Sequence, residues 1–121
     1  MLREFEGLSQ EKTGFRRLLT DAQFDLYLWY DREGGDLVGF QLCYDFGKDP
    51  HCLTQRMGGG SIHTRIDDGE DSPGSYKSSP ILVSDGIFPR AEVLHRFDAS
   101  SSSLAPALRT LVRQAIIDHS D

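Results

Sequence analysis

Two stretches of apolar and aromatic residues, 24–30 and 37–46, dominate the hydrophobic pattern of this chain. A Gly-Gly pair flanked by charged residues separates them, and this arrangement predicts a β-hairpin. A two-residue turn would set apolar side chains opposite polar ones, whereas a three-residue loop, 33–35, aligns apolar pairs on one face. The longer loop is therefore predicted, with Gly35 in the left-handed conformation. The expected pairs are Tyr30–Val38, Leu28–Phe40, Leu26–Leu42 and Phe24–Tyr44.

The same register places a second set of side chains on the opposite face of the hairpin. This face carries Tyr27 and Trp29 on the first strand, and Gln41 and Cys43 on the second. Trp29 lies opposite Gly39, where an indole can cover a strand glycine that has no side chain of its own. If a second layer covers this face, it is core. Otherwise it is an apolar patch of the kind that marks interaction sites.

Weaker patterns flank the central hairpin. Residues 14–19 predict a first strand, and residues 51–57 and 62–66 predict a second hairpin around a run of three glycines. A four-residue loop, 58–61, would put the apolar residues of this hairpin on one face and His63 on the other. The expected pairs are Met57–Ile62, Gln55–Thr64 and Leu53–Ile66.

Two helices are predicted after the strands. Residues 90–97 can form two turns after Pro89, and residues 104–116 carry apolar side chains at the spacing of one helical face. Such a helix must bury its apolar stripe, and the apolar face of the central hairpin is its best partner. With a short strand at 81–83, the prediction is an α+β fold: a five- or six-stranded antiparallel meander with one short and one longer C-terminal helix packed on one face. A partly closed barrel is the alternative, which strand glycines would permit.

The length of 121 residues favours a single domain, 1–121, with a core that needs neither disulfides nor metal. Residues 1–12 are polar and are expected to be loosely held. Residues 67–80 are rich in acids, Ser, Gly and Pro, and they predict an acidic loop of a length that is often functional.

Charge and cysteine content narrow the class of protein. The net charge of −6 repels a phosphate backbone, so no nucleic-acid partner is expected. No apolar run approaches membrane-spanning length, and charges stand where a signal peptide needs an apolar segment, so no membrane partner is expected. Cys43 and Cys52 do not make a disulfide framework, and a bond between them is not expected. These features predict a cytoplasmic location.

Residues with catalytic or metal-binding chemistry are sparse. The acidic loop lacks the ligand spacing of an EF-hand, and the cysteines and histidines lack that of a zinc site. Neither a metal nor another cofactor is therefore expected. His63, close in sequence to Asp67, Asp68 and Glu70, is the best acid–base candidate.

The preferred hypothesis is a small binding or protein-interaction domain. Its contact surface would be Tyr27, Trp29, Gln41 and Cys43 with the adjacent acidic loop, because aromatic residues with polar neighbours are typical interface anchors. The expected partner is another protein or a second copy of this chain, with a small ligand as a further option. The alternative is a small enzyme or metal-binding protein that uses His63 with residues 67–71.

Overall fold

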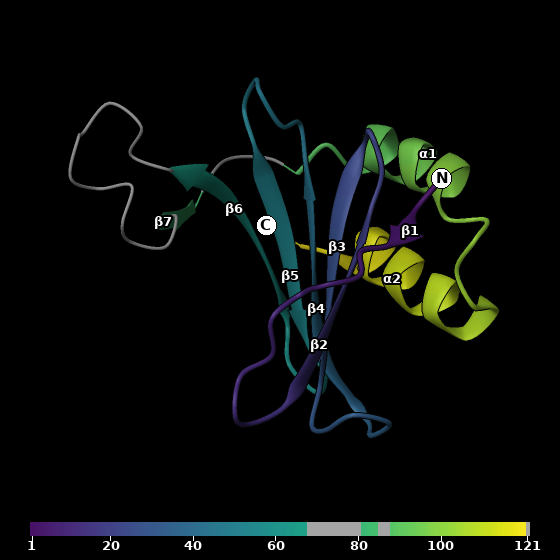
Figure 1. Cartoon of the computed structure of the whole chain (residues 1–121). Helices are drawn as coiled ribbons and strands as arrows, with labels where there is room; N and C mark the ends of the chain where they lie inside the picture. Colours follow the sequence, from purple (N-terminus) through teal and green to yellow (C-terminus); the bar gives the residue numbers. More distant parts are fainter. Residues whose placement is uncertain (68–80, 85–87, 121) are drawn as a thin grey trace.

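A computed structural model of the chain describes residues 1–67, 81–84 and 88–120. An antiparallel sheet forms one layer and two helices form the other (Figure 1). Each strand pairs with the next along the chain, and β1 and β7 are the two edges of an open sheet. Both C-terminal helices lie on one face, so the predicted α+β meander is confirmed, and the barrel alternative is not adopted.

Seven strands precede the two helices in this part of the chain. The strands are β1 (Arg3–Glu4), β2 (Phe15–Thr20), β3 (Phe24–Tyr30), β4 (Leu37–Tyr44), β5 (His51–Arg56), β6 (Ser61–Asp67) and β7 (Ile81–Ser84). The helices are α1 (Arg90–Ser100) and α2 (Pro106–Asp118). Pro106 occupies the first turn of α2, where its missing N–H costs no hydrogen bond.

The core lies between the sheet and the helices. Its sheet side comes from the predicted apolar face of the central hairpin, and its helix side from the apolar stripe of α2 and one face of α1. Ile117, which lies off the stripe, is exposed. The fully buried side chains include Phe24, Leu26, Leu28, Phe40, Leu42, Phe97, Val112 and Ile116.

The central hairpin keeps the predicted register over most of its length. Three of the four predicted apolar pairs are present, and a bulge changes the fourth, so that Leu37 rather than Val38 lies opposite Tyr30. The connecting loop is also longer than predicted and spans residues 31–36. The side chain of Leu37 therefore packs against the core, and Val38 is exposed.

The glycines of this loop have different roles from those predicted. Gly34, not Gly35, is left-handed, with a φ of 74°. The carboxylate of Asp31 accepts a hydrogen bond from the backbone N–H of Asp36 at 2.8 Å and closes the loop. A Cβ on Gly35 would lie 1.9 Å from the Oδ1 atom of Asp31, so a side chain at this position would displace the carboxylate that closes the loop.

The N-terminal residues are held more firmly than the sequence suggests. Leu2 is buried in the core, and its backbone N–H donates to the carbonyl of Ser100 at 2.9 Å. The hydroxyl of Ser103 donates to the Leu2 carbonyl at 2.6 Å, and β1 pairs with the end of β2. The expectation of a loosely held segment therefore fails for Leu2 and β1, because one apolar side chain in a polar stretch reaches the core.

The second hairpin, β5 with β6, is present, but its predicted register is wrong. Leu53 lies opposite His63 rather than Ile66, and the loop spans 57–60, one residue earlier than predicted. Side chains alternate along a strand, so this shift by an odd number of residues exchanges the two faces of β6. His63 turns to the helix-covered face, and Ile62 on the other face is 58% exposed.

Cys43 and Cys52 form a disulfide between β4 and β5, which corrects the expectation of two free thiols. The two residues are directly opposite each other, with their Cα atoms 4.1 Å apart. Cross-strand pairs approach this closely at non-hydrogen-bonded positions. The prediction was wrong because it relied on compartment and chain size, whereas strand register alone brings the two side chains within reach.

The remaining predicted segments are described only in part. The strand expected at 81–83 is β7, which pairs with the end of β6. The acidic loop expected at 67–80 lies outside the described residues, apart from Asp67 at the end of β6. Within the residues that the structure describes, neither helix is long and apolar enough to cross a membrane.

Candidate functional site

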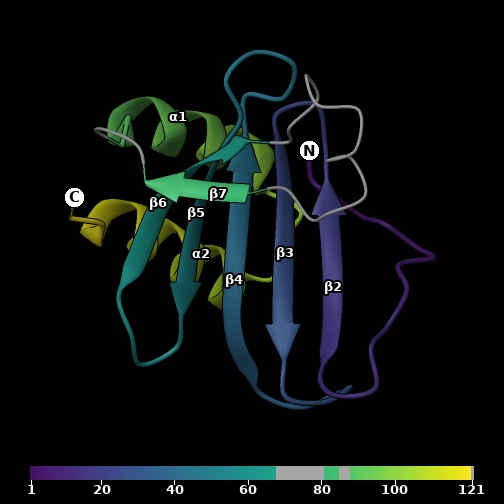
Figure 2. The same ribbon diagram turned by 90° about the vertical axis from the view of Figure 1, so that its left-hand side faces the viewer.

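The first candidate surface is the sheet face opposite the helices, which is turned toward the viewer in Figure 2. We call it the aromatic face and define it by Arg16, Tyr27, Trp29, Gln41 and Arg56, which strand pairing places in adjacent rows. β7 crosses in front of one end of the sheet, and neither helix lies on this side (Figure 2). The rest of the aromatic face is left without a second layer of helices or strands in the described parts of the chain.

Trp29 occupies the middle of the aromatic face. It lies opposite Gly39, as predicted, and a Cβ on that glycine would lie 3.2 Å from the Cε3 atom of Trp29. Arg16 pairs with Trp29 on one side, and Arg56 pairs with Gly39 on the other. The indole is partly exposed, and it lines a hollow of about 190 Å³ together with part of segment 10–16.

Two further side chains fix the polar character of this face. Gln41 donates from Nε2 to the hydroxyl of Thr54 at 2.9 Å, and both side chains are partly buried. Partial burial raises the pKa of the Tyr27 hydroxyl, so the phenol is neutral at physiological pH. The face therefore presents two large rings, one amide and two cations, although the chain as a whole is acidic.

The structure brings only some of the predicted site residues together. Tyr27, Trp29 and Gln41 share the aromatic face, whereas Cys43 on the same face is buried in its disulfide and has no free thiol. His63 is buried on the opposite, helix-covered face, whereas the predicted register of the second hairpin placed it on the face away from the apolar residues. Asp68, Glu70 and the side chain of Asp67 lie outside the described part of the chain.

A second candidate site was missed by sequence reasoning. It is a buried cluster of rings on the helix-covered face, which we call the histidine cluster. It consists of Tyr44, His51, His63, Phe88 and His119. Its residues are as many as 75 positions apart in the sequence, so no local pattern indicates it. The predicted register of β6, which was wrong, also placed His63 on the other face.

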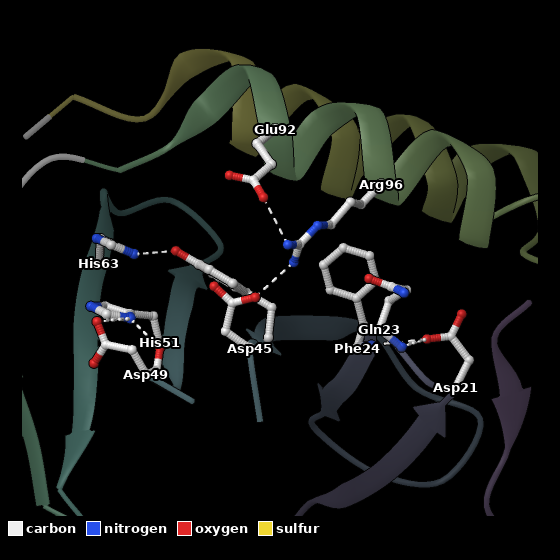
Figure 3. A network of polar contacts seen from close by, with 10 residues as sticks. Asp21, Gln23, Phe24, Asp45, Asp49, His51, His63, Glu92 and Arg96 are labelled. Carbon is white, nitrogen blue, oxygen red and sulfur yellow. Dashed lines mark hydrogen bonds and ion pairs between the residues drawn. The ribbon is translucent and has the colours of Figure 1, made fainter. Parts of the chain in front are cut away.

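Ring stacking and short hydrogen bonds hold the histidine cluster together. The rings of His51 and His63 are stacked with centroids 4.9 Å apart and an interplanar angle of 12°. Tyr44 Oη lies 2.6 Å from His63 Nε2 (Figure 3). Burial raises the pKa of the Tyr44 hydroxyl, so this group keeps its proton and can donate to the imidazole. His51 Nδ1 donates to the backbone carbonyl of Asp49 at 2.7 Å.

An ion-pair bridge ties α1 to the sheet beside this cluster. Arg96 contacts Asp45 at 2.8 Å and Glu92 at 2.7 Å (Figure 3). Asp45 begins the loop after β4 in the left-handed conformation, with a φ of 59°. The bridge therefore fixes this loop, which leads from Tyr44 to His51.

His119 links the histidine cluster to the start of β6. Its Nδ1 atom lies 2.6 Å from the hydroxyl of Ser61, the first residue of β6. Its backbone N–H donates to the carbonyl of Ala115 at 3.0 Å, and its own carbonyl accepts a hydrogen bond from Arg90. Although it follows the last residue of α2, only 4% of it is exposed.

The grouped histidines do not form a metal site in the described residues, where no three His, Cys, Asp or Glu side chains meet as metal ligands. Comparison with known proteins adds no functional information, since no family model, curated protein or solved structure matches this chain.

Proposed function

We propose that this protein is a small binding domain that engages a protein partner through the aromatic face. The observation that carries the proposal is the placement of Tyr27 and Trp29, both partly exposed, on the sheet face that the helices leave uncovered. The core on the other face is already complete without them, because its rings and aliphatic side chains are fully buried. Large rings at a surface are therefore free to serve as interface anchors.

The charges on this face indicate the chemistry of the partner. Arg16 and Arg56 flank Trp29 and Gly39 in the strand rows, although the whole chain has a net charge of −6. The guanidinium of Arg16 already donates to the carbonyl and hydroxyl of Ser9, whereas Arg56 is exposed. An acidic segment of a partner would therefore pair with Arg56 while an apolar or aromatic side chain packs on the indole. A second copy of this chain is the other candidate, and it would bring the same two arginines face to face.

The test begins with the isolation of a protein that the wild-type chain retains from extract. The dissociation constant of this purified partner is then measured for the wild-type chain and for its variants. Trp29→Ala should weaken binding by about 30-fold, the effect of losing an interface hot spot worth about 2 kcal/mol. Arg56→Glu should also weaken binding, and more strongly at low salt than at high salt, because exposed charges are screened.

A matched control is the exposed aromatic residue Phe46, which lies in the loop after β4 and is 45% exposed. Phe46→Ala removes a more exposed ring from another part of the surface, so it should leave the affinity unchanged. Equal affinities of wild type and Trp29→Ala would overturn the proposal. Loss of concentration-dependent association in Trp29→Ala would instead identify a second copy of the chain as the partner.

The compartment remains a prediction. The expected cytoplasmic location rested in part on two free cysteines, and the Cys43–Cys52 disulfide weighs against a reducing compartment. The runner-up function, an enzyme or metal-binding protein that uses His63 with the acidic loop, stays a prediction: His63 is buried on the helix-covered face, and residues 68–71 lie outside the described residues.

A further inference from the structure

A groove of about 400 Å³ lies between the glycine-rich loop 57–60 and one side of α2. Its volume is within the range of small-molecule sites. Met57, Leu111 and Ala115 give it an apolar wall, and Asp118 gives it an acidic end. Ser61, the first residue after the loop, also lines it. This groove is remote from the aromatic face, because Ser61 points to the helix-covered side of the sheet.

Ser61 has a base within hydrogen-bond distance. Its hydroxyl lies 2.6 Å from Nδ1 of His119, a separation typical of a nucleophile and its general base. The serine lines the groove, while the histidine behind it is nearly fully buried. A substrate in the groove would therefore meet the hydroxyl first and the imidazole would take up its proton.

His119 is held rigidly enough to serve this role. Its backbone is fixed at the end of α2 by the Ala115 carbonyl and by Arg90. Its ring meets the ring of Phe88 edge-on at a centroid distance of 5.2 Å, and that of His63 at 6.2 Å. A base fixed in this way does not have to be ordered during a reaction, which is the advantage of a preorganised site.

The strand register also supplies a hydrogen-bond donor for a developing oxyanion. Ile66 donates to the carbonyl of Pro50, which makes this pair a hydrogen-bonded position of the β5–β6 ladder. Bonded and non-bonded pairs alternate along an antiparallel ladder, so the pair of Gln55 and Ser61 is non-bonded. The N–H of Ser61 then points away from β5. In the described residues β7 pairs with β6 only from Thr64 onward, so the β6–β7 pairing does not extend to the N–H of Ser61.

We propose that Ser61 and His119 form a nucleophilic site that hydrolyses small carboxylic esters bound in the groove. The apolar wall suits an aliphatic acyl group, and Asp118 disfavours anionic substrates. Ser61 Oγ attacks the ester carbonyl carbon as its proton passes to His119 Nδ1, and the backbone N–H of Ser61 stabilises the oxyanion. The C–O bond to the alcohol breaks, and the departing alkoxide takes the proton from His119.

Water completes the reaction. His119 accepts a proton from a water molecule that attacks the acyl carbon, and the bond to Ser61 Oγ breaks. The proton returns to the serine, and the carboxylic acid leaves. The products are one acid and one alcohol, and no oxidant, reductant or metal is required for the balance.

The experiment uses the full chain with p-nitrophenyl butyrate as substrate and a fluorophosphonate as covalent probe. Peptide mass spectrometry should find the phosphonate adduct on Ser61. Ser61→Ala should lower ester hydrolysis by about 100-fold or more, the usual contribution of such a catalytic group. Ser102→Ala, which changes an exposed serine between the helices, should keep both the rate and the adduct.

A second variant tests the role of His119 as the general base. His119→Gln retains a side chain of similar size, and its fold can be checked by circular dichroism and thermal unfolding. If it folds, the Ser61 adduct should form at least about 100-fold more slowly. Absence of an adduct on Ser61, or equal hydrolysis by wild type and Ser61→Ala, would overturn the proposal. Neither result depends on a partner binding at the aromatic face.

Discussion

At the scale of single residues, Gly35 and Gly39 show how the room for a Cβ atom determines which residue fits a position. Neither has a positive φ, yet a Cβ at Gly35 would meet a carboxylate and a Cβ at Gly39 would lie 2.9 Å from the carbonyl oxygen of Gln55. Gly39 also provides the flat surface on which Trp29 lies. The sequence predicted this second contact because the register of the central hairpin was already determined by its apolar pairs.

Gly39→Ala should destabilise the fold. The added methyl group would press on the Gln55 carbonyl and on the indole of Trp29, and such overpacking costs about 1–3 kcal/mol. Urea denaturation, followed by circular dichroism, would measure the change. The control is Gly60→Ala, where a Cβ meets no atom within 4 Å and φ is not left-handed, so the free energy of unfolding should be unchanged or slightly higher. Equal unfolding free energies for the two variants would mean that β4 and β5 are farther apart than described.

At the scale of elements, local patterns were sufficient for the central hairpin and insufficient for its neighbour. β3 and β4 carry so many apolar side chains that only one register buries them, so their pairing follows from sequence. β5 and β6 alternate less clearly, and their register depends on the burial of His63 against Tyr44 and Phe88 from other elements. The histidine cluster could therefore not be predicted without tertiary contacts.

The disulfide between β4 and β5 gives a prediction for this pair of strands. The two cysteines are 9 positions apart, and closing a loop of this size stabilises a fold by about 2–3 kcal/mol in the chain-entropy account. The double variant Cys43→Ala/Cys52→Ala should lose about this much in chemical denaturation. Thiol titration of the unfolded, unreduced wild-type protein should find no free thiol. Two reactive thiols under these conditions would contradict the bond.

The contact between the helices predicts a pH effect. Asp98 of α1 accepts a hydrogen bond from Arg113 of α2 at 2.7 Å and lies 3.4 Å from Arg109. The hydrogen bond from Arg113 lowers the pKa of the Asp98 carboxyl in the folded protein. The ion pair therefore adds stability above the unfolded-state pKa of about 4, and this stability is lost as pH falls through the lower folded-state pKa.

Asp98→Asn tests this contact. The carboxylate is partly exposed, so the variant should lose only about 0.5–1 kcal/mol of unfolding free energy at pH 7. The difference from wild type should shrink toward zero at a pH below the lowered pKa of Asp98, where the wild-type carboxyl is protonated as well. Urea denaturation at the two pH values would measure it. A difference that stayed constant with pH would show that the effect comes from packing and not from charge.

At the scale of the whole molecule, the two faces of the sheet carry different kinds of side chains and different candidate sites. The helix-covered face contains the apolar core, the histidine cluster and the Ser61–His119 pair. The opposite face carries partly exposed rings and arginines, with a disulfide at the end that β7 crosses. Loss of a side chain from the aromatic face should therefore affect association more than stability, and loss of a core side chain should do the opposite.

The single Trp makes this division measurable, because its fluorescence comes only from the aromatic face. In dilute solution the partly exposed indole of Trp29 should emit at a wavelength between those of a free and a fully buried indole, and acrylamide should quench it. Trp29→Ala should cost less than about 2 kcal/mol of stability, because a partly exposed ring loses only part of its buried area. Leu26→Ala, at a fully buried position, should cost about 2–5 kcal/mol.

If two copies associate through this face, quenching should weaken as protein concentration rises, and Arg56→Glu should change that dependence. Blue, unquenchable emission at every concentration, with a Trp29→Ala cost near that of Leu26→Ala, would mean that the chain itself covers the face and that no partner binds there.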